Sequence, residues 1–537
     1  MAGGRTIPTC ERLIAAATAL SCVLVPVAAR ADDYGAFGKA RFAASAGNVT
    51  TAAEQYGVAL AGSPDNELIA GRAFRQAMAA GDLALARRAA AAMGDKAPPD
   101  SRLLALADAI VRNDAAATEA ALVPLKDTPF EFVGPVTHAW QLAGKGGDGA
   151  ATLGDGARLG AVGRLYNEQR VLLLIAQNDM PRAIKALGDE FRASSSGLDL
   201  RYAAAELLIG NGDKPLAMRL LTGDASEVAA VRNGLPGLKG TTAFGVSRLL
   251  VRLASDLNDA ASTPIAISLA RTALVLDPND GRARIVLAFA LARQGAHDRG
   301  LAVLDEVGAD NAFRKLAGLG RVEVLRLKGD IPAALAAARP LAEAPDNDPE
   351  SAELYGNMLL AADRPLEAAA AYERARDRLG DKAGWEVWLQ LGTAYEKAGK
   401  WPQAKAAFER ATTLAPEQAV ALNSYGYALV ERGEDLPRAV TMLEKAHGLA
   451  PDQPSIADSL AWAYFRSGDA GRALPLLEDA GQRAPGNAEI AEHLGDVYWA
   501  NGRRYEARYA WKAARIVAEG KAVARLDAKI LDGPRPS

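Results

Sequence analysis

The feature that most constrains the fold of this chain is a spacing of 34 residues between similar side chains in its C-terminal part. In a frame that starts at Trp385, positions 4, 7, 8, 11, 20, 24, 27 and 32 hold Trp388, Leu391, Gly392, Tyr395, Ala404, Phe408, Ala411 and Pro416. Frames that start at Ala419, Pro454 and Ala488 repeat most of these marks. A unit of this length cannot bury its own apolar face, so we expect neighbouring units to stack on one another.

The residue types at these positions resemble the tetratricopeptide repeat family. The resemblance implies an all-α fold, a right-handed α-solenoid of stacked helix–turn–helix repeats. Small residues at positions 8 and 20 mark the close crossing of the two helices, and larger apolar residues fill positions 4, 7, 11 and 24. We expect glycines near position 15, such as Gly399 and Gly468, to end the first helix in the left-handed conformation. Proline near position 32 is expected to end the second helix.

The same period continues towards the N-terminus with weaker marks, and the resemblance is specific only from about residue 349 onward. A glycine-rich stretch from Gly144 to Gly156 interrupts it and lacks the Gly-Lys-Ser/Thr sequence of a phosphate loop. The predicted segments are a signal peptide (1–31), N-terminal repeats (32–123), an irregular Gly-rich insertion (124–163), degenerate repeats (164–246), central repeats (247–384), consensus repeats (385–518), and a cap helix with a tail (519–537).

The first 31 residues have the pattern of an export signal. Arg5 and Arg12 precede an uncharged, largely apolar run from Leu13 to Ala29. Ala29-Arg30-Ala31 then has the spacing of a cleavage site. We therefore expect a periplasmic protein. The alternatives are an uncleaved anchor, for which the apolar run is short, and a protein peripheral to the envelope membranes.

The side chains predict no catalytic, metal or cofactor site. Both cysteines, Cys10 and Cys22, lie in the export segment, where a lipid on Cys22 is a further alternative. The four histidines, His138, His297, His447 and His493, lack a second ligand at metal spacing and are expected to be surface or packing residues. No G-x-S-x-G motif occurs, and the carboxylates are expected on solvated helix faces. The net charge of −3 gives no basic footprint for nucleic acid. We expect neither an enzyme nor a cofactor.

A second stripe on the first helices, at positions 2, 5, 9 and 12, is the candidate binding surface. At 100° per residue it lies roughly 130° from the core positions. Aromatic side chains alternate there with carboxylates, as in many recognition surfaces. Its predicted partner-binding residues are Asn423, Tyr427, Asp458, Trp462, Phe465, Arg466, Glu492, Asp496 and Trp499. The alternative is that these aromatics pack against the first helix of the adjoining repeat.

In the tetratricopeptide family this stripe lines the concave groove, and one subset holds a C-terminal carboxylate there with Lys, Asn and Arg. In this sequence Asp458, Glu492 and Asp496 make the stripe acidic, with only Arg466 nearby. A basic or mixed apolar segment therefore fits better. Our leading hypothesis is a scaffold or adaptor that binds a peptide segment or a protein of the bacterial cell envelope. An accessory factor of polysaccharide synthesis or export is the second reading, and an enzyme is the third.

Overall fold

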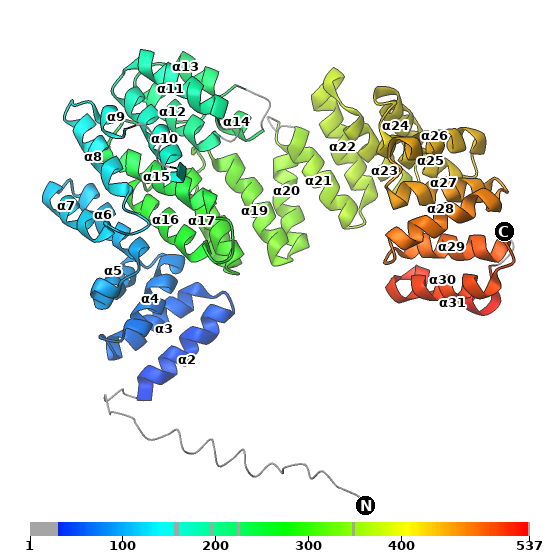
Figure 1. Cartoon of the computed structure of the whole chain (residues 1–537), viewed down its shortest axis with the longest axis horizontal. Coiled ribbons are helices and arrows are strands. Elements are labelled where there is room, and N and C mark those ends of the chain that lie inside the picture. Colours follow the sequence, from blue (N-terminus) through cyan, green and yellow to red (C-terminus); the bar gives the residue numbers. More distant parts are fainter. Residues whose placement is uncertain (1–30, 155–159, 194–196, 223–225, 346–348, 535–537) are drawn as a thin grey trace, which may run out of the picture. The chain divides into compact units, whose positions relative to one another are not determined.

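The computed structural model describes residues 31–154, 160–193, 197–222, 226–345 and 349–534, and every regular element within these ranges is a helix (Figure 1). The all-α helical repeat fold is therefore confirmed. Except for Ala31, the predicted signal peptide lies outside the described residues, as does Cys22. Among the described helices, none combines the length and the apolar character needed to cross a membrane.

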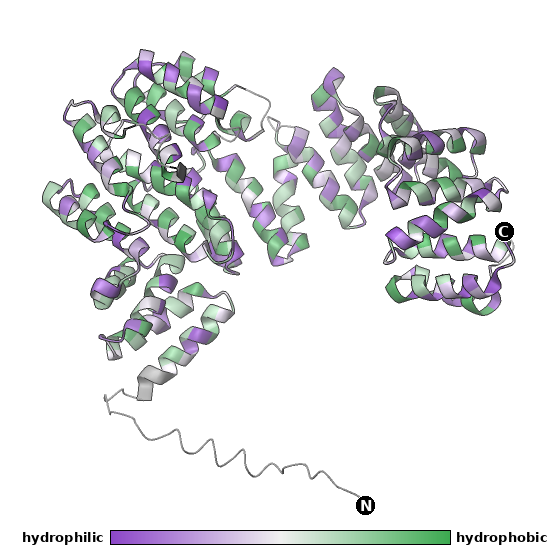
Figure 2. Ribbon diagram, in the orientation of Figure 1, coloured by the Kyte–Doolittle hydropathy of each residue, from purple (hydrophilic) through white to green (hydrophobic). Residues whose placement is uncertain are grey.

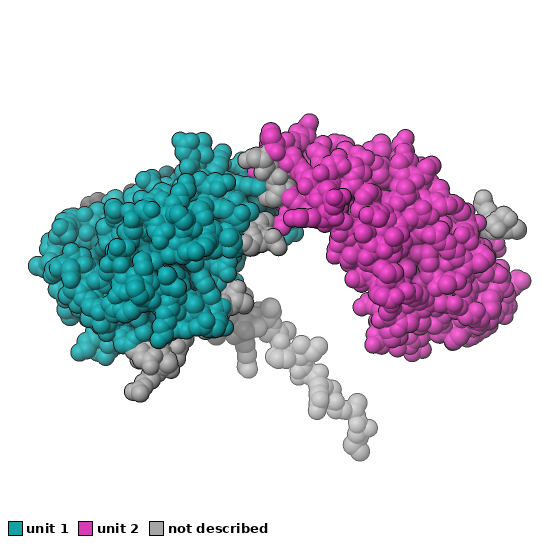
Figure 3. Space-filling model, turned by 90° about the horizontal axis from the view of Figure 1, so that it is seen from above, with its two compact units in different colours: residues 1–334 teal, residues 335–537 magenta. Residues whose placement is uncertain are grey.

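The chain divides into two compact units, residues 1–334 (unit 1) and residues 335–537 (unit 2), which are coloured separately in Figure 3. Helices of unit 1 are α2 (Ala31–Ser45), α3 (Val49–Gly62), α4 (Glu67–Ala80), α5 (Leu83–Met93), α6 (Pro99–Val111), α7 (Ala115–Leu122), α8 (Val133–Gly144), α9 (Gly149–Thr152), α10 (Gly160–Ala176), α11 (Met180–Ala193), α12 (Leu198–Gly210), α13 (Lys214–Leu220), α14 (Ser226–Val231), α15 (Thr242–Asp256), α16 (Thr263–Leu276), α17 (Gly281–Arg293), α18 (His297–Asp305) and α19 (Arg314–Lys328).

Helix α20 (Ile331–Glu343) runs across the boundary. Helices of unit 2 are α21 (Pro349–Ala361), α22 (Pro365–Leu379), α23 (Trp385–Lys397), α24 (Trp401–Leu414), α25 (Ala419–Arg432), α26 (Leu436–Leu449), α27 (Pro454–Arg466), α28 (Ala470–Arg483), α29 (Ala488–Ala500), α30 (Arg504–Val517) and α31 (Lys521–Asp532). The described residues also contain three short 3-10 turns: η1 (Gly94–Lys96), η2 (Val123–Leu125) and η4 (Gly380–Lys382).

Unit 1 departs from a linear stack because helices far apart in the sequence pack together. Helix α16 contacts both α6 and α4, and α15 contacts α8. From α16, the buried Arg271 donates hydrogen bonds from Nε to the carbonyl of Met78 (3.1 Å) and from its NH2 group to the carbonyl of Ala79 (3.2 Å). These carbonyls belong to the last turn of α4, whose negative dipole end favours a cation. Arg271 thus ties the beginning of unit 1 to its centre.

The segment 124–163, predicted as an irregular insertion, contains a packed helix. Helix α8 buries Trp140, whose Nε1 donates to Gln169 at 2.8 Å and whose ring lies 5.9 Å from Phe244. Gly245 makes this packing possible, because a Cβ at that position would come within 2.1 Å of the Trp140 ring. The glycine-rich composition therefore did not reveal the apolar helix face of Val133, Val136 and Trp140, which packs against other helices of unit 1.

In unit 2, each repeat is a pair of antiparallel helices, from α21/α22 to α29/α30. The glycine at position 8 lies against the large side chain at position 24. A Cβ on Gly392 would come within 2.6 Å of Phe408, and one on Gly495 within 2.3 Å of Trp511. Small residues were predicted at positions 8 and 20, where the two helices cross. The position-24 side chain is the nearest neighbour of position 8, and Ala404 at position 20 is fully buried.

The predicted helix ends are confirmed. Gly399 and Gly468 have positive φ angles of 70° and 88°, which glycine adopts without strain. Helix α24 ends at Leu414, two residues before Pro416. These stops fix the helix length, and therefore the face that each repeat offers to the next.

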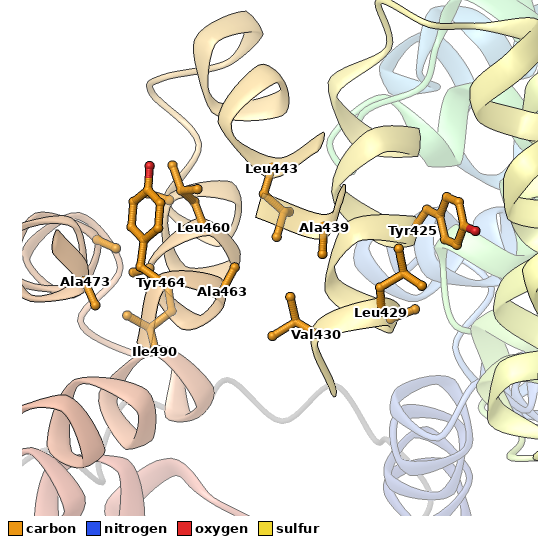
Figure 4. Packing of buried hydrophobic residues seen from close by; sticks show 14 of the residues in the cluster. Tyr425, Leu429, Val430, Ala439, Leu443, Leu460, Ala463, Tyr464, Ala473 and Ile490 are labelled. Carbon is orange, nitrogen blue, oxygen red and sulfur yellow. The ribbon is translucent and has the colours of Figure 1, made fainter. Parts of the chain in front are cut away.

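One buried hydrophobic cluster of unit 2 extends from α23 to α29. Hydrophobic and hydrophilic residues share the same helices (Figure 2), as expected of helices that bury one face. Figure 4 shows part of the buried cluster, in which Leu443 of α26 and Leu460 of α27 pack between the side chains of α25, α28 and α29. Each repeat thus completes the core of its neighbour, which is the requirement predicted from the 34-residue spacing.

A hydrogen-bond ladder on the second helices accompanies this core. A glutamate at position 25 of one repeat accepts a hydrogen bond from a tyrosine of the following repeat: Glu373 from Tyr395, Glu409 from Tyr425 (2.9 Å), Glu444 from Tyr464 (2.8 Å) and Glu478 from Tyr498 (2.8 Å). The ladder satisfies phenol groups at the edge of the core. It was not predicted: the glutamates keep position 25, but Tyr425 lies at position 7 of its repeat and the other three tyrosines at position 11.

Candidate functional site

An open pocket of about 480 Å³ lies across the first helices of three successive repeats and the terminal helix of unit 2. Helices α25 and α27 contact each other, as do α27 and α29, so the same face of each repeat contributes to one surface. The lining consists of Tyr427 and Glu431 from α25, Trp462 from α27, Ala488, Glu489, Glu492, His493 and Asp496 from α29, and Ala522, Arg525, Leu526 and Lys529 from α31.

Two hydrogen bonds cross this surface between repeats. Tyr427 donates to Oε1 of Glu489 at 2.5 Å, and Trp462 donates from Nε1 to Oε1 of Glu431 at 2.7 Å. Burial and the bond to Glu489 raise the pKa of Tyr427, so the phenol stays a donor. In the described part of the chain, the second oxygen of each carboxylate accepts no hydrogen bond, and the nearest cation to Glu431 is Arg466 at 4.0 Å. Glu431 and Glu489 therefore each have one carboxylate oxygen that is not used by Tyr427 or Trp462.

His493, in the wall of the pocket, forms a buried ion pair with Asp458. The His493 Nδ1 atom lies 3.0 and 3.1 Å from the two Asp458 oxygens, and its ring stacks on Trp462 with centroids 4.0 Å apart and planes at 10°. Burial lowers the pKa of His493, but the hydrogen bond and charge of Asp458 outweigh it, and the pKa is raised overall. One face of Trp462 is therefore already covered. Asp458 positions His493 and does not face the pocket.

The acidic side chains of the last repeat are neutralised by α31. Arg525 donates to both oxygens of Glu492 (2.8 and 2.7 Å), and Lys529 donates to Glu492 (2.7 Å) and Asp496 (2.6 Å). Burial raises the pKa of Glu492, yet these two cations lower it overall. Burial also raises the pKa of Asp496, and there it outweighs Lys529. The prediction that only Arg466 lies near these acids was wrong, and the expectation that carboxylates lie on solvated helix faces fails for the buried Asp458 and Glu492.

Five of the predicted partner-binding residues do not line the pocket: Asn423, Asp458, Phe465, Arg466 and Trp499. Asn423 is half-buried beside it, and its Oδ1 has no hydrogen-bond partner among the described residues. Phe465 packs on Trp462, with ring centroids 5.2 Å apart, and on the core. Trp499 packs on Trp511 at 5.5 Å, and the backbone after α31 approaches its ring. These two aromatic rings therefore pack on rings of their own repeats.

The pocket lining overlaps the predicted stripe of positions 2, 5, 9 and 12 and extends beyond it to neighbouring positions of the first helices. It includes positions 2, 5 and 9, through Glu489, Glu492, Asp496, Tyr427 and Trp462, and also positions 6 and 13, through His493 and Glu431. Glu431 at position 13 lies off the predicted stripe, and Glu489 lies on it but was not among the predicted partner-binding residues.

Unit 1 contains a separate buried ionic network beside an open pocket of about 430 Å³. Arg248 donates to Glu206 (2.9 Å), Asp277 (3.0 Å) and Asp280 (2.5 Å), and its guanidinium lies 4.8 Å from the centre of the Phe244 ring. Burial raises the pKa of Glu206, while the charge of Arg248 opposes the shift. The network connects α12, α15 and the turn before α17, and we regard it as part of the architecture of unit 1.

Comparison with known proteins locates the strongest similarity in the same region as the pocket. Residues 389–454 and 459–520 match the model of the tetratricopeptide repeat family. A tetratricopeptide repeat-containing protein of Pseudomonas aeruginosa is 43% identical over 53 residues, which span 10% of this chain and 9% of the length of that relative.

Similar solved structures include a tetratricopeptide repeat protein from Parabacteroides merdae, with a TM-score of 0.40 and 14% identity, covering 46% of this chain and 96% of that one. A thermophilic repeat protein from Thermus thermophilus has a TM-score of 0.31 and 21% identity, covering 34% and 99%. MamA from Desulfovibrio magneticus has a TM-score of 0.28 and 18% identity, covering 32% and 94%.

Proposed function

We propose that this chain, which belongs to the tetratricopeptide repeat family, is a non-catalytic scaffold. The repeats of that family serve as protein-interaction scaffolds, and we propose that the pocket of unit 2 binds a basic segment of a partner protein. The observation that carries the proposal is the pair of carboxylates, Glu431 and Glu489, held by aromatic donors on adjacent first helices. Each has an oxygen left to accept a hydrogen bond, and a guanidinium or ammonium group is the natural donor.

The neighbouring part of the same surface supports this choice of ligand. There, Glu492 and Asp496 already bind two basic side chains, Arg525 and Lys529, which are four residues apart on a helix. A partner that presents basic residues at the same spacing would extend this pattern towards Glu431 and Glu489. Aromatic edges from Tyr427 and Trp462 would contact the aliphatic stems of such side chains.

The place of action that we propose is the bacterial periplasm, and the partner a protein of the cell envelope. This part of the proposal rests on the sequence pattern of residues 1–31. Cell fractionation with N-terminal sequencing of the isolated protein tests it. Recovery from the cytoplasm with residues 1–31 intact would overturn it.

Peptide binding tests the pocket. We would probe immobilised full chain with helical peptides that carry Arg or Lys four residues apart and with matched peptides that carry Glu instead. Glu431→Gln combined with Glu489→Gln removes both charges but keeps acceptors for Trp462 and Tyr427. Because hydrogen bonds to charged groups contribute about 1.5–3 kcal/mol each, the double variant should bind the basic peptides at least ~10-fold more weakly.

The matched control combines Glu417→Gln with Asp452→Asn, which removes the same charge from exposed sites elsewhere in unit 2. This control should bind like the wild type. Equal binding of basic and acidic peptides, or equal loss in both double variants, would contradict the proposal.

A further inference from the structure

The outer face of α30 carries a row of side chains that the repeat fold leaves uncovered. Tyr505, Tyr509 and Ile516 are 79%, 70% and 83% exposed, among the highest values of any large apolar residue in the described chain. With the exposed Lys512, they follow the spacing i, i+4, i+7 and i+11. At 100° and 1.5 Å per residue, the four lie within an arc of about 60° along roughly 16 Å of helix.

The two tyrosines differ from those in the ladder of unit 2. Tyr395, Tyr425, Tyr464 and Tyr498 each donate to a glutamate of the preceding repeat. Tyr505 and Tyr509 make no hydrogen bond with another described side chain. A tyrosine with an exposed ring and a free hydroxyl suits an interface that is apolar on one side and wet on the other.

Charge around this row has the opposite sign from the chain as a whole. Between residues 503 and 532, four basic residues (Arg504, Arg508, Lys512 and Lys521) and two acidic ones (Glu519 and Asp532) form no ion pair with a described residue, whereas the whole chain has a net charge of −3. Within the described ranges, Arg504 and Lys512 form no ion pair; Arg504 stacks over Trp499 at 4.7 Å. The row is thus flanked by cations that remain available to an anionic surface.

We infer that this row of α30, consisting of Tyr505, Tyr509, Lys512 and Ile516, docks on the surface of an anionic lipid bilayer. The tyrosine rings would lie at the level of the headgroups, Ile516 would enter the acyl boundary, and Lys512 would meet lipid phosphates. The row lies on a second helix, whereas the pocket is formed by first helices and α31, so the inference is independent of the proposed peptide site.

A second copy of the chain is a poorer occupant. In a two-fold symmetric contact along this row, the same patch faces itself, and Lys512 would come close to the Lys512 of the other copy. The excess of basic residues on both sides would add to the repulsion. An anionic surface has no such penalty.

Vesicle co-sedimentation of the full chain tests the inference. Vesicles of phosphatidylcholine containing about one third phosphatidylglycerol should bind the protein, and pure phosphatidylcholine vesicles should not, because basic residues bind through the negative surface potential. Binding should fall as the salt concentration rises. The combined variant Tyr505→Ser, Tyr509→Ser and Ile516→Ser should lose most of the binding, and Lys512→Glu should weaken it roughly 5-fold or more.

Leu366→Ser is the matched control, because Leu366 is also exposed (57%) but lies on α22 at the other end of unit 2. It should bind vesicles like the wild type, and circular dichroism should show the same helix content for all variants. The inference is overturned if anionic vesicles do not bind the wild type or if the triple variant binds equally well. It is also overturned if sedimentation velocity shows a dimer that the triple variant abolishes.

Discussion

Replacing Gly495 with alanine tests whether position 8 of the repeat is governed by packing or by helix propensity. Propensity alone predicts that Gly495→Ala stabilises α29 by about 1 kcal/mol. The structure opposes this, because a Cβ at Gly495 would lie 2.3 Å from Nε1 and 2.4 Å from Cδ1 of Trp511. Trp511 is fully buried, and its Nε1 donates to Asp496 at 3.0 Å, so the ring has little freedom to retreat.

The magnitudes decide the sign. Overpacking in a filled core costs about 1–3 kcal/mol. Displacing Trp511 from Asp496 would add the loss of a hydrogen bond, about 0.5–1.5 kcal/mol. After the gain in propensity is subtracted, we expect Gly495→Ala to destabilise the last repeat by roughly 1–3 kcal/mol.

Hydrogen exchange followed by mass spectrometry is the suitable assay, because a repeat array opens locally and the signal from α29 and α30 can be separated from the rest. Gly448→Ala is the matched control: Gly448 is exposed, lies in α26, and a Cβ there would have nothing within 4 Å. It should slow exchange or leave it unchanged. If Gly495→Ala exchanges as slowly as the wild type in α29 and α30, the packing argument is wrong.

Three further predictions concern the same unit. Ala404→Leu places a large side chain at a fully buried position and should destabilise unit 2 by about 1–3 kcal/mol in thermal melts; a melt equal to that of the wild type would refute it. Asp458 raises the pKa of His493 above 6.5. The stability that this pair contributes is therefore complete below about pH 6.5 and is lost as the pH rises through the raised pKa. The melting temperatures of the wild type and of His493→Gln should converge at alkaline pH. Glu492→Gln should weaken the bonds from α31 by about 1–3 kcal/mol and speed hydrogen exchange in residues 521–532. Unchanged exchange there would show that the charge of Glu492 does not hold α31 in place.

The spacing of 34 residues was sufficient to predict the helix pairs of unit 2, because each mark has a local physical cause. Gly399 ends a helix in the left-handed conformation, and Pro416 follows the end of the next helix. Such effects act within a few residues of the chain. The cross-chain packing of unit 1 has no comparable local cause: Arg271 meets carbonyls 192 and 193 residues earlier in the sequence, and no period announces that contact.

Four of the nine predicted partner-binding residues line the candidate pocket: Tyr427, Trp462, Glu492 and Asp496. Phe465 and Trp499, both at position 12, instead pack on neighbouring aromatic rings. A helical pattern fixes the core face, but it does not fix how far each repeat turns relative to the next. That turn decides which of two neighbouring rows of side chains stays open, and it depends on the side chains packed between repeats.

The partners of the buried acids explain why unit 2 ends in α31 as it does. Asp458 pairs with His493, 35 residues later, on the first helix of the next repeat. Glu492 occupies the same repeat position, and its partner Arg525 lies 33 residues later, on α31. Helix α31 therefore takes the place of one more first helix. A last repeat without it would leave Glu492 half-buried and unpaired, which costs far more than the pair itself contributes. Two interactions therefore hold α31 at the end of the array: its basic residues pair with Glu492, and Leu526 is buried against Trp511. The acidic end of this surface thus requires a basic segment as its cap.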